Sequence, residues 1–180
     1  MQGNIKFFNG FNSITGTGDL KSALSNLLQL AAEAAKSSAA SIYLVNTGQN
    51  TLEPLITYGL PQSYVEACGH VRIGEQCCGR AVQHRKPWVV TDMLTDPLFA
   101  SARAAAVMSP IRAAFSVPVI AEDGQCIGSL ACHFDQPYTP TAGDIQRNKD
   151  WAIMIAHVIS EYKRSPSVPN QGEARARGIA

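Results

Sequence analysis

The sequence has no run of apolar residues long enough to cross a membrane. Its longest apolar stretches fall well short of the roughly 18–20 residues that a membrane helix requires. Residues 1–10 contain one lysine and lack the apolar core of a signal peptide. We therefore expect a soluble cytoplasmic protein that does not contact a membrane.

The chain also lacks an excess of charge of either sign, because 15 lysines and arginines nearly balance 14 aspartates and glutamates. The formal net charge is +1, so there is no basic field of the kind that attracts nucleic acid, and no nucleic-acid partner is predicted. The five cysteines are odd in number and include no CxxC pair, which argues against a disulfide framework or a zinc site.

Catalytic motifs are missing as well. The chain contains no glycine-rich phosphate loop, no Gly-x-Ser-x-Gly elbow and no pair of carboxylates at metal-binding spacing. We therefore expect a protein that is not an enzyme, and the sequence identifies no cofactor and no metal.

The composition is that of a globular chain, with 46% hydrophobic and 16% charged residues among 180. This length predicts one domain. We divide the chain into an N-terminal extension (1–17), a ligand-binding domain (18–163) and a flexible tail or linker (164–180) that has almost nothing to bury.

Hydrophobic periodicity predicts two hairpins with helices at both ends, an arrangement typical of an antiparallel sheet covered by helices. Helices are expected at 19–35, after Pro61, at 75–85, 96–107 and 139–162, and strands at 41–45, 52–58, 71–73, 88–91, 113–120 and 125–134. Pro118 is expected at a sheet edge or bulge, because proline cannot donate to a ladder. The last helix has two apolar stripes and needs cover on two sides, one by the sheet and the other by the first helix and a second subunit.

Five segments, in this order and spacing, resemble the GAF domain family over about residues 18–163. They are GEQCCGRAV at 74–82, PWVVTD at 87–92, Asp96-Pro97, IRAAFSVPV at 111–119, and Gly124 with IGSL at 127–130. The resemblance implies an α+β fold: an antiparallel sheet of five to six strands, with the N- and C-terminal helices on one face and pocket helices and loops of residues 70–110 on the other. Such domains bind cyclic nucleotides, tetrapyrroles, haem, small anions or metabolites.

Ten residues in and around this region are candidates for ligand contact. The free N–H groups at the start of helix 75–85 are suited to an anion or a carbonyl. Arg112 could clamp a carboxylate or phosphate, although a structural bridge to Asp92 or Asp96 is the favoured interpretation. Aromatic side chains here fit either a pocket wall or plain core. The candidates are Gly74, Cys77, Cys78, Trp88, Asp92, Phe99, Arg103, Arg112, Phe115 and Ser116. The ligand is an unknown small molecule, with an anion or carboxylate as the suggested class.

The cysteines at the start of helix 75–85 carry the alternative hypothesis. A helix N-terminus can lower a thiol pKa, which favours a thiol redox enzyme or sensor. Among the families that the chain resembles, free methionine-R-sulfoxide reductases place a cysteine at the position of Cys78. Their second cysteine has no counterpart in loop 101–109, so reductase activity is not expected. The signatures of cyclic-nucleotide binding and of covalent bilin attachment are also missing.

None of the four histidines, His70, His84, His133 and His157, has metal-ligand spacing with another histidine or cysteine. His133 alternates with Cys132 and so shares a strand face with Ser129 and Ala131, which we interpret as the outer face. The resemblance as a whole implies a regulatory sensor that forms a homodimer through its terminal helices and acts on an output domain or a partner protein. A structural dimerisation module with an empty pocket is the third possibility.

Overall fold

The computed structural model describes residues 18–164. The expected extension (1–17) lies outside the described residues, and so does the expected tail (164–180) apart from Arg164, the last residue of a helix. Within residues 18–164, no helix combines the length and the apolar character needed to cross a membrane.

The core of the fold is one six-stranded antiparallel sheet in the order β3-β2-β1-β6-β5-β4. The strands are β1 (Ala39–Asn46), β2 (Thr51–Tyr58), β3 (Val71–Arg72), β4 (Trp88–Val90), β5 (Ala113–Ile120) and β6 (Cys126–Phe134). Both hairpins occur as predicted, and the long central strands β1 and β6 join them. The predicted α+β class with an antiparallel sheet is confirmed.

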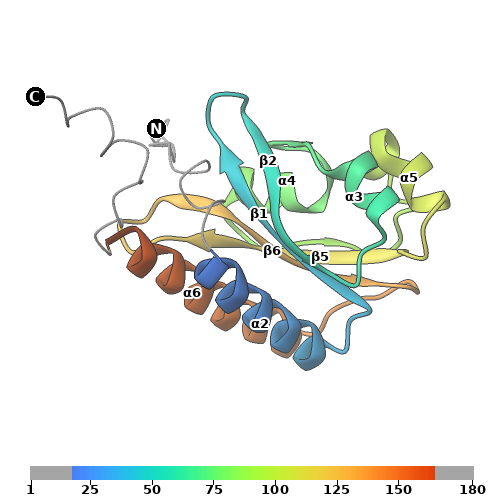
Figure 1. Ribbon diagram of the computed structural model, residues 1–180. Helices are drawn as coiled ribbons and strands as arrows, with labels where there is room; N and C mark the ends of the chain where they lie inside the picture. The colour runs from blue at the N-terminus through green and yellow to red at the C-terminus, as the bar shows by residue number, and fades with distance from the viewer. Residues whose placement is uncertain (1–17, 165–180) are drawn as a thin grey trace, which may run out of the picture.

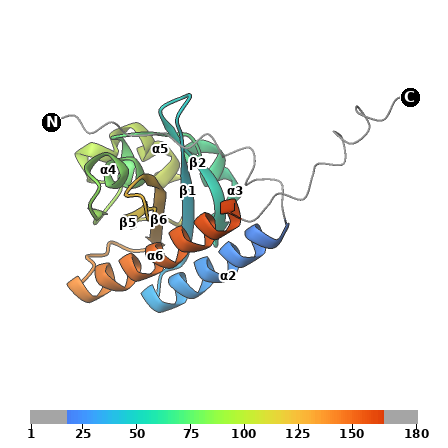
Figure 2. The same cartoon turned by 90° about the vertical axis from the view of Figure 1, so that its left-hand side faces the viewer.

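Two layers of helices cover the sheet, one on each face (Figures 1 and 2). The long helices α2 (Gly18–Ala35) and α6 (Ala142–Arg164) lie side by side and antiparallel on one face. The opposite face carries shorter elements: α3 (Gln62–Cys68), α4 (Gln76–His84), the 3₁₀ helix η1 (Pro97–Ala102) and α5 (Arg103–Val107). The expected arrangement of terminal helices on one face and pocket helices on the other is therefore present.

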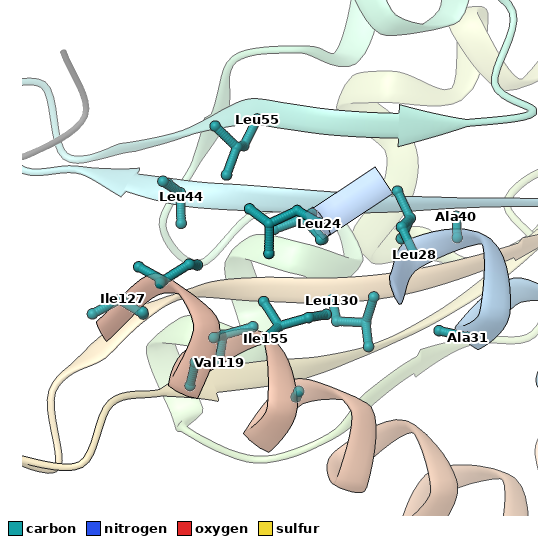
Figure 3. Close-up of a cluster of buried hydrophobic side chains, with 14 of the residues drawn as sticks. Leu24, Leu28, Ala31, Ala40, Leu44, Leu55, Val119, Ile127, Leu130 and Ile155 are labelled. Atoms are coloured by element: carbon teal, nitrogen blue, oxygen red, sulfur yellow. The ribbon is translucent and has the colours of Figure 1, made fainter. Parts of the chain in front are cut away.

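The larger core lies between the sheet and the long helices, as Figure 3 shows. Leu24 and Leu28 of α2 and Ile155 of α6 are fully buried against the inward side chains of the central strands. Burying one such side chain stabilises the fold by about 1.5–3 kcal/mol. This layer therefore anchors the terminal helices firmly to β1 and β6.

Helix α6 buries one face and exposes another. Ala152, Ile155 and Ile159 are buried, and Trp151, Val158 and Tyr162 are partly buried on the same core. Ile153 and Met154 remain 65% and 46% exposed. The sheet and α2 therefore cover the buried side of α6, as predicted, and Ile153 and Met154 leave apolar surface exposed on its other side.

The start of α6 differs from the prediction. Thr139 and Pro140 were expected to begin the helix, but it begins at Ala142 because Thr141 is the cap. The backbone N–H of Asp144 donates to Thr141 Oγ1 (3.2 Å), and the Thr141 backbone N–H donates to Asp144 Oδ2 (2.8 Å). This reciprocal capping box satisfies two helix-end donors and places both the cap and the first helical residue two positions later than predicted.

The predicted helix 96–107 is also corrected, since it divides into the 3₁₀ helix η1 and the short helix α5. The Arg103 Nη2 group donates to the carbonyl oxygen of Asp96 (2.9 Å) and holds the two pieces together. Strand β4 pairs with β5 only as far as Ser116, so Pro118 has a strand partner on one side, β6, and none on the β4 side. The expected edge position of Pro118 is therefore confirmed.

Candidate ligand-binding site

A small cavity of about 10 Å³ lies between the sheet and the shorter helices, near the lower limit for holding one water molecule. The sheet, α3, α4, η1 and the loop after β4 all contribute to its wall. The described residues that line it are Tyr43, Tyr64, Cys68, Val71, Gln76, Cys77, Cys78, Met93, Phe99, Ala114 and His133.

Strand alternation builds the floor of the cavity. Tyr43 of β1, Ala114 of β5 and His133 of β6 reach it from three strands, and Ala114 faces His133 directly across the β5–β6 ladder. Gln76 at the start of α4 has φ 50°, a left-handed conformation that costs a non-glycine residue roughly 1–2 kcal/mol. Backbone strain of this kind tends to gather at functional sites.

His133 is the polar centre of the floor and is only 5% exposed. Its Nε2 atom is hydrogen-bonded to Ser41 Oγ at 3.0 Å. Its ring packs edge-on against the Tyr64 ring, with 6.2 Å between the ring centres. The Nδ1 atom is buried and has no hydrogen-bond partner. Burial lowers the pKa of His133 to about 4, so the ring is neutral at pH 7. The face shared with Ser129 and Ala131 is therefore the covered face of the sheet, not the outer face as predicted.

The two tyrosines of the cavity are also held neutral. Burial raises the pKa of both Tyr43 and Tyr64 far above the ordinary phenol value. The Tyr64 hydroxyl donates a weak hydrogen bond to the Met93 sulfur at 3.8 Å. That contact links α3 to the loop after β4 across the top of the cavity.

The thiols are buried rather than activated, which corrects the predicted lowering of their pKa. Burial raises the pKa of Cys77 and Cys78 and raises that of Cys68 to about 11. The Cys77 thiol donates to the carbonyl oxygens of Trp88 (3.3 Å) and Ala114 (3.5 Å). Because a thiolate is the reactive form, these sulfurs are poor nucleophiles at pH 7.

Arg112 forms the predicted bridge to Asp92, at the end of the sheet. Its Nη2 and Nε atoms donate to Asp92 Oδ2 (2.8 Å) and Oδ1 (3.2 Å). The hydrogen bonds from Arg112 lower the pKa of Asp92, which also accepts from the Leu94 backbone N–H (3.0 Å). The pair thus fixes the loop that carries Met93, and neither side chain lines the cavity.

The other candidates are distributed around the cavity or away from it. Cys77, Cys78 and Phe99 line it. Ser116 faces the same side and donates to the carbonyl oxygen of Leu130 (3.3 Å), and Trp88 stacks on His84 (5.0 Å between ring centres). Gly74 has φ 97°, and its N–H donates to the carbonyl oxygen of Gly79. Arg103 is bonded to Asp96, and neither Arg103 nor Gly74 lines the cavity.

Phe115 lies on the opposite face of the sheet, stacked on Phe134 at 5.9 Å between ring centres. It alternates with Ala114, which lines the cavity, so only one of the two neighbours can face it. The expected pocket role of Phe115 does not fit this placement.

Several lining residues were not foreseen from the sequence. Tyr43, Tyr64 and Met93 carry no motif and resemble ordinary core residues, and Ala114, although it lies within the segment IRAAFSVPV, was not among the candidates. His133 had a usable signal, because strict alternation places it on the face of two small residues, Ser129 and Ala131, which leave room above the sheet. Only the assignment of that face to the outside was wrong.

A second hollow, which we call the groove, encloses about 420 Å³ at the end of the sheet where α2 ends and α6 begins. It is lined by Ala34, Ala35, Lys36, Phe134, Asp135, Gln136, Pro137, Tyr138, Asp144 and Arg147. Its most buried carboxylate, Asp144, accepts from the Thr141 and Tyr138 hydroxyls and pairs with Arg147. The groove is larger than the cavity, but these groups serve the cap of α6, so we take the cavity as the candidate site.

Among residues 18–164, no three or more histidine, cysteine or acidic side chains are arranged to hold a metal ion.

Comparison with known proteins places this geometry in context. The family model described as GAF domain matches residues 19–157. No curated protein matches the chain.

Solved structures with the same fold include a domain of a two-component sensor histidine kinase from Sinorhizobium meliloti 1021, with 17% identity and TM-score 0.70, covering 89% of this chain and all of that one. The free methionine-R-sulfoxide reductase from Neisseria meningitidis, solved with its substrate, has 21% identity and TM-score 0.68, with 86% of each chain covered. The GAF domain of an Acinetobacter phosphoenolpyruvate-protein phosphotransferase has 17% identity and TM-score 0.65, covering 87% of this chain and 92% of that one.

Proposed function

Because the chain belongs to the GAF domain family, we propose that it is a regulatory domain that binds a small molecule in the cavity beside His133. The unpartnered Nδ1 atom of His133 carries this proposal. A buried polar atom without a partner costs about 1–3 kcal/mol, and a ligand that supplies the missing hydrogen bond recovers that energy. The names of similar structures, a sensor kinase and a phosphotransferase among them, support a regulatory role.

The cavity as it stands is too small for a metabolite, so binding requires the shorter helices to move. Met93 and Phe99 on that side are connected to the sheet by loops and by a 3₁₀ helix. Methionine is unbranched and repacks easily around a guest. We propose that a ligand enters by displacing Met93 and the neighbouring α3.

Occupancy would reach the long helices through the central strands. Tyr43 and His133 face the cavity, whereas Leu44 of β1 and Leu130 of β6 lie on the other face of the same two strands and pack against α2 and α6. If a ligand binds more tightly to one position of these strands, it shifts the equilibrium between two positions of the terminal helices. The size of that shift is set by the difference in the ligand's binding free energy between the two states. We propose a homodimer formed through α2 and α6, acting on an output domain or partner protein.

A pair of neighbouring alanines provides the test. Ala114 lines the cavity, and Ala113 is equally buried on the other face of β5. Ala114→Val and Ala113→Val add the same two carbons, and each overpacks the fold by about 1–3 kcal/mol. In a thermal-shift screen of small metabolites, a ligand that raises the Tm of the wild type and of Ala113→Val should not raise that of Ala114→Val. Equal shifts in both variants would place binding elsewhere, and a domain that no compound stabilises would be a structural dimerisation module.

The second candidate function is thiol redox chemistry at Cys78, favoured by the reductases among the similar structures. The raised pKa of the Cys78 thiol and the absence of a cysteine from residues 101–109 argue against it, and we propose that the chain is not an enzyme. The comparison of wild type with Cys78→Ser decides between the two. Turnover of free methionine sulfoxide by the wild type that is lost in Cys78→Ser would establish the reductase.

A further inference from the structure

We propose that the ligand of this cavity is an uncharged molecule that hydrogen-bonds to His133 Nδ1. The inference rests on the proposed function, and it replaces the anion or carboxylate suggested by the sequence with a different chemical class.

The first argument is the wall of the cavity. None of the described residues that line it is an aspartate, glutamate, lysine or arginine. Its titratable groups are three thiols, two phenols and one imidazole. Burial favours the neutral form of each of them, because it raises the pKa of the thiols and phenols and lowers that of the imidazole.

The second argument is that the two expected cations, Arg103 and Arg112, do not line the cavity. The guanidinium of Arg112 is bonded to both carboxylate oxygens of Asp92, and that of Arg103 donates to the carbonyl oxygen of Asp96. Because none of the described residues that line the cavity is a lysine or arginine, an anion bound beside His133 would lose its hydration without a cation in direct contact, at a cost of several kcal/mol. A cation would meet the same penalty, since no described carboxylate lines the cavity.

The third argument concerns the hydrogen bond that His133 can offer. When Nε2 donates to Ser41 Oγ, the Nδ1 atom is an acceptor for a ligand hydroxyl or N–H group. When the Ser41 hydroxyl donates to Nε2, Nδ1 carries the proton and can donate to a ligand carbonyl. The buried Ser41–His133 pair thus suits a ligand with one neutral donor or acceptor and an otherwise apolar body, bounded by Met93 and Phe99.

A single buried water is the alternative occupant, because the cavity volume is near that of one water. The experiment must therefore distinguish neutral ligands, charged ligands and water alone. Benzamide and benzoate form a matched pair, being nearly identical in shape and differing in charge, and phenol provides a neutral hydroxyl.

We would follow the ring nitrogens of His133 by ¹H–¹⁵N NMR during titration with each probe. The other three histidines are exposed, so replacing each in turn with asparagine identifies the His133 signals by elimination. Benzamide or phenol should shift the Nδ1 resonance and raise the Tm, with benzoate at least about tenfold weaker, which corresponds to about 1.4 kcal/mol. His133→Phe should abolish the Tm shift, and His157→Phe, on the exposed side of α6, should retain it.

The outcomes separate the two proposals. If benzoate or inorganic phosphate perturbs His133 as strongly as benzamide, the ligand is not restricted to neutral molecules, while the sensor function stands. If no probe of either charge perturbs His133 in the wild type, the cavity holds water alone and both proposals fall. Because this reading uses the wild-type protein, it holds even if His133→Phe does not fold.

Discussion

The imidazole of His133 and the hydroxyl of Ser41 form a buried hydrogen bond of 3.0 Å between strands β6 and β1. It joins the two strands that carry the cavity on one face and the long helices on the other. The pair satisfies one ring nitrogen and leaves the second without a partner. This incomplete pairing gives the buried histidine both its effect on stability and its proposed role in binding.

The first prediction concerns acid stability. Between the unfolded pKa of 6.5 and the folded value of about 4, the unfolded chain takes up a proton at position 133 and the folded protein does not. Unfolding therefore becomes more favourable as the pH falls, by about 2 kcal/mol between pH 7 and 5. Urea unfolding of the wild type and of His133→Phe measures this, because the difference between them cancels the other titrating groups. If the free energy of unfolding falls equally with pH in the wild type and in His133→Phe over this range, His133 protonates freely in the folded state.

The second prediction concerns thiol reactivity. All five cysteines are buried. With a disulfide reagent at pH 8, every native thiol should react roughly a hundredfold more slowly than the thiol introduced by Gln49→Cys, in an exposed turn. That ratio corresponds to an opening free energy of about 2.7 kcal/mol. One native cysteine that matches the introduced thiol in rate would revive the redox hypothesis.

The third prediction concerns the close approach of β1 and β6. A Cβ at Gly128 would lie 2.1 Å from the carbonyl oxygen of Tyr43, so Gly128→Ala must push two central strands apart. We expect a loss of about 1–3 kcal/mol or more in the free energy of unfolding. Gly48→Ala is the control, since its nearest neighbour is Asn46 Oδ1 at 3.7 Å, and it should change stability by no more than about 0.5 kcal/mol. Equal effects of the two substitutions would show that the strands adjust without cost.

The fourth prediction tests the proposed dimer. Ile153 on α6 and Met108 at the end of α5 are both exposed apolar residues, 65% and 84% respectively, on opposite faces of the sheet. Ile153→Lys should raise the dimer dissociation constant because a lysine ammonium is costly to bury in an interface. Met108→Lys should leave it unchanged. Sedimentation equilibrium measures both, and a dimer that tolerates Ile153→Lys would not use this face of α6.

The sequence allowed the order of elements and the sheet class to be predicted, because strand alternation and the caps of the long helices are local signals. The resemblance placed the pocket on the correct face of the sheet, and Cys77, Cys78 and Phe99 do line the cavity. Most of the other lining residues could not be predicted, because they come from elements that are distant in the chain and, like Met93, resemble core. The start of α6 was misplaced because Thr139 and Thr141 are both plausible caps, and only the bond between Thr141 and Asp144 distinguishes them. The pKa of Cys77 and Cys78 was misjudged because burial outweighs the helix N-terminus, and burial is a tertiary property.

Hydrogen exchange measured with and without a bound neutral probe such as benzamide tests the central claim most directly. If the ligand occupies the cavity beside His133, protection should increase in residues 62–68, 76–84 and 97–107, which must close over it. If increased protection is confined to residues 34–36 and 134–147, the ligand lies in the groove and the account is contradicted.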